Sequence, residues 1–314
     1  MKPINNRKAF SMIELLFVIV IMGIVGGVAL EAVREYYNGI YRTGIYTKRI
    51  AEADYILEQI SKYFENGVSD SIIRLDENDA TGCYGVPATG DDAKDYTIAF
   101  VAVDSDGAQG GYWSPTHSRW LPAWTSDVVS NGTALTSLDA NYTAINTVAN
   151  PLTAQNAAIF RREGLGEGAD ECHRFGWNSG GNTNNVYRTI NAVVSDTELT
   201  LNNPLSLTGG QVSRAYVLRT AYAFRAKGGA FKMYSGFKPW KNERYTDLNV
   251  IAHLLADKVT HFTILYDNTN TNINSNVGNI YTLKICMQGV DENLSDSTHS
   301  KDQICRERMV HVRY

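Results

Sequence analysis

The feature that most constrains this chain is an apolar run near its N-terminus. The run extends from Phe10 to Leu30, a stretch of 21 residues in which Glu14 is the only charge. At about 1.5 Å per residue, a helix of that length crosses the hydrocarbon core of a bilayer. A carboxylate at that depth costs about 2.5 kcal/mol or more. The sequence therefore predicts a membrane segment in which some other group meets the charge of Glu14.

Basic residues stand just ahead of the run, at Lys2, Arg7 and Lys8. A secretory signal peptide has an apolar core of about 7–15 residues followed by a small-residue cleavage site, and this run is longer. An ordinary signal anchor would not need Glu14. Positive residues stay on the cytoplasmic side, so the chain after Leu30 is predicted to lie across the membrane.

The segment Phe10-Ser11-Met12-Ile13-Glu14-Leu15-Leu16 resembles the prepilin N-terminus of type IV pilins and type II secretion pseudopilins. The resemblance implies that a prepilin peptidase removes a leader, residues 1–9, between Ala9 and Phe10. It also implies N-methylation of Phe10 and places Glu14 fifth in the mature chain. The family usually has Gly before the cut, where this chain has Ala9. Ala is the nearest residue to Gly in size, so cleavage is still expected, at a lower rate than with Gly at this position.

Cleavage before Phe10 would create an α-amino group inside the membrane. The carboxylate of Glu14 can neutralise that cation, within one subunit or between two, because buried charges persist when they are paired. The resemblance implies that this pairing sets the register of a subunit entering a filament. The partners it implies are other minor and major pilins or pseudopilins, the prepilin peptidase and the bacterial inner membrane.

Length, charge and composition limit what the rest of the chain can be. The 314 residues allow one large domain or two small ones. Without Lys2, Arg7 and Lys8 the chain has 26 basic and 33 acidic residues, a net charge of −7. That balance argues against general nucleic-acid binding, which needs a basic surface. Asn, Thr, Ser and Gly are abundant beyond residue 65, as in a loop-rich extracytoplasmic β domain.

An apolar stripe continues past the membrane run. It begins with Val33, Tyr36 and Ile40, and resumes at intervals of three and four residues, which indicate one apolar helix face. Its later members are Tyr46, Ile50, Ala53, Leu57, Ile60 and Phe64. One helix from Phe10 to Phe64 would be roughly 80 Å long, with its second half packed under a sheet. Gly23, Gly26 and Gly27 mark either a stretch that unwinds during assembly, as in related filaments, or close packing between membrane helices.

The expected fold is α+β and pilin-like: a long N-terminal α-helix packed against an antiparallel β-sheet, with a large loop-rich β insertion over residues 88–215. The expected regions are the leader 1–9, the transmembrane half of the helix 10–30, its amphipathic periplasmic half 31–66, and a periplasmic β domain 67–314. A hairpin with a turn at Lys227-Gly228-Gly229 and a short helix from Val250 to Leu255 are also expected. Predicted strands are Tyr96–Val103, Ile190–Leu201, Val212–Leu218, Ala221–Arg225, Ala230–Tyr234, Val259–Tyr266, Tyr281–Met287 and Met309–Arg313.

Residues 108 to 180 carry little regular signal but hold four tryptophans. These could form an exposed contact surface or anchor long loops from inside, and the second interpretation is preferred. The four are Trp113, Trp120, Trp124 and Trp177.

Four cysteines follow the membrane segment, and a periplasmic location permits disulfides. Four cysteines allow three pairings, between which sequence alone cannot choose. Cys286 with Cys305 is preferred because the spacing is short and both flank predicted strands. The resemblance favours the same pair, since many pilins staple a C-terminal loop. Cys83 would then pair with Cys172, and four buried free thiols are the alternative.

Catalytic motifs are not evident. None of the six histidines has metal-ligand spacing, and the chain has no G-x-S-x-G, phosphate-loop or dinucleotide motif. The stretch from Asp267 to Asn279 is rich in oxygen ligands and could bind calcium, although a flexible loop is the preferred interpretation. The expectation is a protein without enzymatic activity, cofactor or metal.

A second resemblance lies at Leu254 to Tyr266, after the Gly228-Gly229 hairpin. This segment looks like the PilW-type minor pilins and the J-type pseudopilins, which have Val, Phe and Tyr on a strand after a short helix. It implies a minor subunit near a filament tip that helps initiate or cap a type IV pilus or a type II secretion pseudopilus. The alternatives are a membrane-tethered adhesive or ligand-binding module that uses residues 88–215, and a major pilin.

Overall fold

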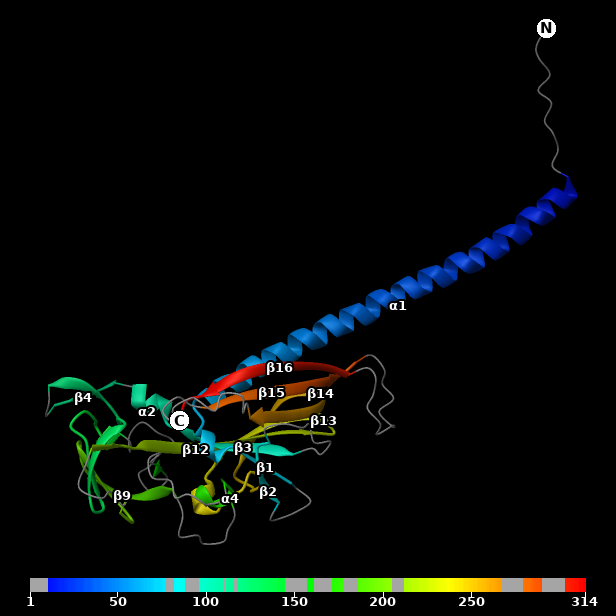
Figure 1. The fold of residues 1–314 in the computed structure, drawn as a ribbon. Coiled ribbons are helices and arrows are strands. Elements are labelled where there is room, and N and C mark those ends of the chain that lie inside the picture. Colours follow the sequence, from blue (N-terminus) through cyan, green and yellow to red (C-terminus); the bar gives the residue numbers. More distant parts are fainter. Residues whose placement is uncertain are drawn as a thin grey trace.

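The structure is a computed structural model in which one long helix leaves a body of antiparallel strands (Figure 1). It describes residues 11–76, 82–87, 96–109, 111–115, 118–144, 157–160, 171–177, 186–204, 212–266, 279–289 and 303–314. The helical elements are α1 (Met12–Glu65), η1 (Ser69–Ser71), α2 (Ser105–Gln109), α4 (Glu171–Arg174) and η2 (Pro239–Lys241). The strands are β1 (Ile73–Leu75), β2 (Cys83–Gly85), β3 (Thr97–Val103), β4 (Gly111–Ser114), β5 (Arg119–Pro122), β6 (Asp127–Asn131), β7 (Ala134–Thr136), β8 (Ala158–Phe160), β9 (Tyr187–Ser195), β10 (Glu198–Leu201), β11 (Val212–Arg214), β12 (Tyr216–Lys227), β13 (Gly229–Phe237), β14 (Ile251–Tyr266), β15 (Asn279–Gln288) and β16 (Gln303–Val312).

Helix α1 has 54 residues and is therefore about 80 Å long. It runs unbroken through Gly23, Gly26 and Gly27, because an isolated glycine costs a helix only about 1 kcal/mol. Its buried residues all lie in the C-terminal part, at Ala53, Ile56, Leu57, Ile60, Ser61 and Phe64. The buried stripe is thus shorter than the apolar pattern predicts: Ile50 is 37% exposed and Tyr36 68%. In Figure 1 the N-terminal part of α1 projects away from the strands, so much of the stripe has no sheet to pack against.

The main sheet divides at the long strand β12. One edge of β12 pairs with β13, and from there the order continues through β14 and β15 to β16. The other edge pairs with β3 over Leu218–Phe224 and with β8 over Tyr216–Leu218. From β8 the strands continue in the order β9, β10, β7, β6 and β11, which we call the outer branch. Every pairing in the sheet is antiparallel, and the expected fold class, α+β with a long helix on an antiparallel sheet, is confirmed.

Strand β3 is buried on both faces because it lies between two hydrophobic cores. Ile98, Phe100 and Ala102 belong to the core that α1 covers. The alternate residues Ala99, Val101 and Val103 belong to the core that the outer branch encloses. Successive side chains of a strand point to opposite faces, so a continuous apolar run suits a strand with no solvent face.

The expected short helix over Val250–Leu255 is wrong. Residues from Ile251 onward form the first part of β14, where His253 pairs with Met233 and Leu254 with Lys232. A short apolar run fits a helix or a strand equally well, and here the backbone pairing offered by β13 decides. The helix that the second resemblance implies before its strand is therefore strand.

Three other expectations need correction. The stretch Ile190–Leu201 is two strands, β9 and β10, joined by a turn at Asp196 and Thr197. The stretch Val212–Leu218 is interrupted at Ala215, because β11 pairs with β6 whereas β12 pairs with β8 and β3. Residues 108–180 contain the strands from β4 to β8 and the helix α4. These strands have only three to five residues each, too few for their periodicity to be recognised.

Candidate functional site

The N-terminal part of α1 exposes a long apolar surface. Its most apolar 18-residue window has a mean hydropathy of 2.7, and none of that window is buried against the body of the protein. Met12, Phe17 and Leu30 are 92%, 60% and 72% exposed. By length and composition this helix can cross a membrane. An exposed apolar surface of this extent needs lipid or another protein around it.

Glu14 lies in the first turn of this helix and is exposed. Its backbone N–H donates to the carbonyl of Ser11 at 3.0 Å. A carboxylate in the first turn interacts favourably with the partial positive charge of the helix N-terminus. Ala9 and Phe10, where cleavage is expected, lie outside the described residues.

Comparison with protein families bears directly on this helix. The family described as the prokaryotic N-terminal methylation motif matches residues 4–30. The chain carries the signature of type IV pilins and pseudopilins. Neither curated proteins nor solved structures gave a significant match to the chain.

This signature supports a pilin-like or pseudopilin-like subunit that is anchored in the inner membrane and whose role is structural rather than catalytic. The motif implies assembly with other pilins and processing by a prepilin peptidase. The motif covers the N-terminal segment alone, so the likeness to PilW-type and J-type subunits stays a prediction.

Two disulfides tie the pilin-like body together. Cys286 on β15 lies directly opposite Cys305 on β16, with 4.0 Å between their Cα atoms. Cys83 on β2 is bonded to Cys172 on α4, with 5.8 Å between the Cα atoms. The first bond joins neighbouring strands at the edge of the sheet, and the second fastens α4 to a strand 89 residues away in sequence.

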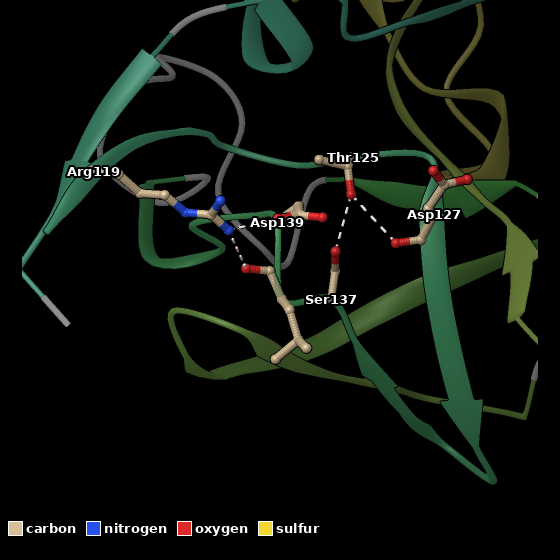
Figure 2. A network of polar contacts seen from close by, with 6 residues as sticks. Arg119, Thr125, Asp127, Ser137 and Asp139 are labelled. Atoms are coloured by element: carbon tan, nitrogen blue, oxygen red, sulfur yellow. Dashed lines mark hydrogen bonds and ion pairs between the residues drawn. The ribbon is translucent and has the colours of Figure 1, made fainter. Parts of the chain in front are cut away.

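The strands β4 and β5 form a separate hairpin beside the outer branch. Figure 2 shows how it is held: Arg119 donates to the carboxylate of Asp139 at 2.6 Å, which links β5 to the turn after β7. Nearby, the hydroxyls of Thr125 and Ser137 lie 2.9 Å apart, and Thr125 also donates to the carbonyl of Asp127 at 3.3 Å.

The hairpin presents two aromatic side chains to solvent. Trp113 and Trp120 face each other across the strands, with ring centroids 6.2 Å apart, and are 51% and 67% exposed. Trp124 is instead 3% exposed, and its indole N–H donates to the carbonyl of Asp104. The preferred interpretation, in which tryptophans anchor loops from inside, is therefore right for Trp124 and wrong for this pair.

A buried carboxylate lies where β3 ends. Asp104 is 4% exposed, accepts a hydrogen bond from the N–H of Gly107, and has Arg219 at 3.9 Å. Arg219 also contacts the carboxylate of Asp106. Burial raises the pKa of Asp104 above its ordinary value, an effect that the Gly107 bond and Arg219 only partly offset. These contacts serve structure, because they fasten α2 to β12.

No cluster of three metal-ligating side chains occurs in the described part of the chain. The oxygen-rich loop considered for calcium, residues 267–278, lies outside it.

Proposed function

We propose that this chain is a minor subunit that helps initiate or cap a type IV pilus or a type II secretion pseudopilus. In this proposal the leader, residues 1–9, is removed, residues 10–30 span the inner membrane, and residues 31–66 continue the helix into the periplasm. The β domain, residues 67–314, is then periplasmic until the subunit enters a filament near its tip.

The observation that carries the minor role is the outer branch. A bulk pilin repeats along the whole filament, so its surface must pack against copies of itself. Here the outer branch of the main sheet extends from β12 on the side away from the departing helix (Figure 1). Such bulk is difficult to repeat in a closely packed helical array, but an end position accommodates it. Contacts with unlike neighbours at an end are heterologous and do not by themselves close into a symmetric ring.

The abundance of the chain in filaments tests this role. Quantitative mass spectrometry of sheared filaments should find it at a few copies per filament, well below another pilin. If this chain is the most abundant filament protein, it is a major pilin and the proposal fails.

The processing step has its own test. N-terminal sequencing and intact mass of the membrane-extracted protein should show a mature chain that begins with a methylated Phe10. An uncleaved Met1, or a mature chain that begins elsewhere, would contradict the role proposed for Ala9 and Glu14.

A tethered adhesive module is the second candidate, and the exposed pair Trp113 and Trp120 favours it. Large aromatics on a surface commonly mark binding sites. Deletion of the filament machinery separates the two functions, because an independent adhesin should still bind its target surface whereas a filament subunit should not. Trp113→Ala with Trp120→Ala should then abolish binding, and Tyr84→Ala, which removes another exposed aromatic, should leave it intact.

A further inference from the structure

The hairpin of β4 and β5 has two different faces. Side chains alternate between the faces along a strand, and residues directly opposite each other in an antiparallel pair share a face. Ser114 and Leu121 are buried, and Arg119, which lies opposite Ser114, is fastened to Asp139. These three residues therefore form the face that the hairpin turns toward the body.

The other face, which we call the tryptophan face, carries two indoles and no charged side chain. Trp113 lies opposite Trp120, and the other pair on this face is Gly111 with Pro122. The charge of Arg119, on the inner face, is already matched by the carboxylate of Asp139 at 2.6 Å. A ligand on the tryptophan face thus meets flat apolar rings and no unmatched charge from the hairpin strands, which favours a neutral ligand over an ion.

Both indoles of the tryptophan face are accessible. More than half of each residue is exposed, and the two ring planes are inclined by 70°, so the pair forms an open corner. Within the described part of the chain, neither indole N–H has a hydrogen-bond partner. An indole N–H can only donate. Trp113 and Trp120 therefore offer apolar ring surface for stacking together with two donors at the edges of the rings.

The tryptophan face lies where a ligand outside the membrane can reach it. Figure 1 shows β4 at the end of the body opposite to the direction in which α1 departs. A cross-strand aromatic pair also stabilises its own hairpin, but this hairpin is already attached to the body through Leu121 and the ion pair of Arg119. Side chains that combine an apolar body with a polar edge are enriched at binding surfaces.

We propose that the tryptophan face binds a neutral, β-linked sugar chain. In a β-linked glucose unit every substituent is equatorial, so both faces of the ring present C–H groups and the hydroxyls form a rim. The C–H face stacks on an indole, and oxygens of the rim accept hydrogen bonds from the N–H groups of Trp113 and Trp120. This inference rests on the second candidate function, the tethered adhesive module, and names the class of ligand that the module takes.

Acrylamide quenching of tryptophan fluorescence measures occupancy of the face in the full-length protein. Of the five tryptophans, Trp124 and Trp240 are buried and Trp177 is partly buried, so quenching reports chiefly on Trp113 and Trp120. The probes are cellohexaose and chitohexaose, with α-linked maltohexaose as the reference. A polyoxyethylene detergent is used because detergents with sugar headgroups would compete. At least one β-linked hexaose should reduce the quenching, and titration calorimetry should give its affinity.

Variants show whether the rings themselves bind the sugar. Trp120→Ala should weaken binding by about tenfold or more, the factor expected when one stacked aromatic ring is lost. Trp120→Phe should retain part of the affinity because a ring remains. Tyr84→Ala, at an exposed aromatic on β2, is the matched control and should bind as the wild type does. Near-ultraviolet circular dichroism checks folding. If Trp120→Ala does not fold, Trp120→Phe and the quenching of the wild type carry the test.

The inference is overturned if neither β-linked hexaose binds, or if Trp120→Ala binds as the wild type does. It is also overturned if no sugar binds and Trp120→Ala is lost from sheared filaments, because the face is then a contact with another subunit. Failure of the inference is distinct from failure of the adhesive function. Cells that adhere while the purified protein binds no sugar keep the adhesive module and exclude this ligand. A purified protein that binds sugar in a strain that does not adhere supports the site and excludes the module.

Discussion

Phe64 in the last turn of α1 and Phe100 in the middle of β3 lie with their ring centroids 4.3 Å apart and their planes tilted by 40°. Both side chains are fully buried. Phe224 on β12 completes the group, at 5.8 Å from Phe64 and 6.1 Å from Phe100. These rings join the helix that leads into the membrane to the strand at which the two cores of the body meet.

Phe64→Ala should lower the free energy of unfolding by about 3–5 kcal/mol, because it removes a buried ring and leaves a cavity between helix and sheet. Phe17→Ala is the matched control on the same helix, at a side chain that is 60% exposed, and should leave the stability of the body unchanged. Urea unfolding of the detergent-solubilised protein, followed by tryptophan fluorescence, measures both. Equal losses in the two variants would mean that the ring cluster does not hold the helix to the sheet.

Glu14→Ala should impair assembly and leave folding intact. Glu14 makes no contact with the buried core, so the periplasmic body should fold normally in the inner membrane. An unpaired α-amino group would then have to be buried in the filament, at a cost of about 3–5 kcal/mol, and incorporation should fall by tenfold or more. Immunoblots of sheared filaments measure incorporation. Glu31→Ala, beyond the apolar run, is the control, and normal incorporation of Glu14→Ala would contradict the pairing.

The two disulfides should differ in their effect on stability. In the chain-entropy model, a bond that closes a loop of 19 residues contributes about 3 kcal/mol and one that closes 89 residues about 4.5 kcal/mol. Replacement of Cys83 and Cys172 by serine should therefore cost more than replacement of Cys286 and Cys305. Non-reducing peptide mapping establishes the pairs, and urea unfolding compares the variants. A crossed pairing, or a larger loss at Cys286 and Cys305, would count against this account.

The buried carboxylate of Asp104 should make stability depend on pH. Its pKa is raised above the ordinary 3.8 chiefly by burial, so the folded protein holds this proton more tightly than the unfolded chain. As pH rises from about 3.8 toward the raised folded pKa, the free energy of unfolding should fall by this contribution. Over that window the free energy of unfolding of the wild type should fall relative to that of Asp104→Asn, which has no proton to lose at this position. Asp257→Asn, at an exposed position on β14, controls for the loss of one negative charge. Urea unfolding across pH measures both free energies. A wild type that gains stability relative to Asp104→Asn as pH rises would refute the assignment.

Expectations from local pattern succeeded where one physical signal dominated. The spacing of Ala53, Leu57, Ile60 and Phe64 predicted the buried helix face, and the glycines after Lys227 predicted the hairpin of β12 and β13. Positive φ angles at Gly228 and Gly229 show why glycine is required at that turn. Local pattern failed at Val250–Leu255, where a partner strand decided between two conformations that the residues allow equally.

By itself, the sequence determined the membrane helix, the isolated charge of Glu14 and the pilin-type signature, because each depends on residues that are close neighbours along the chain. Only the tertiary structure decided that the main sheet divides at β12 and that Trp113 faces solvent while Trp124 is buried. These features arise from contacts between distant segments, and such contacts are chosen by the total burial and backbone pairing that the whole chain can reach.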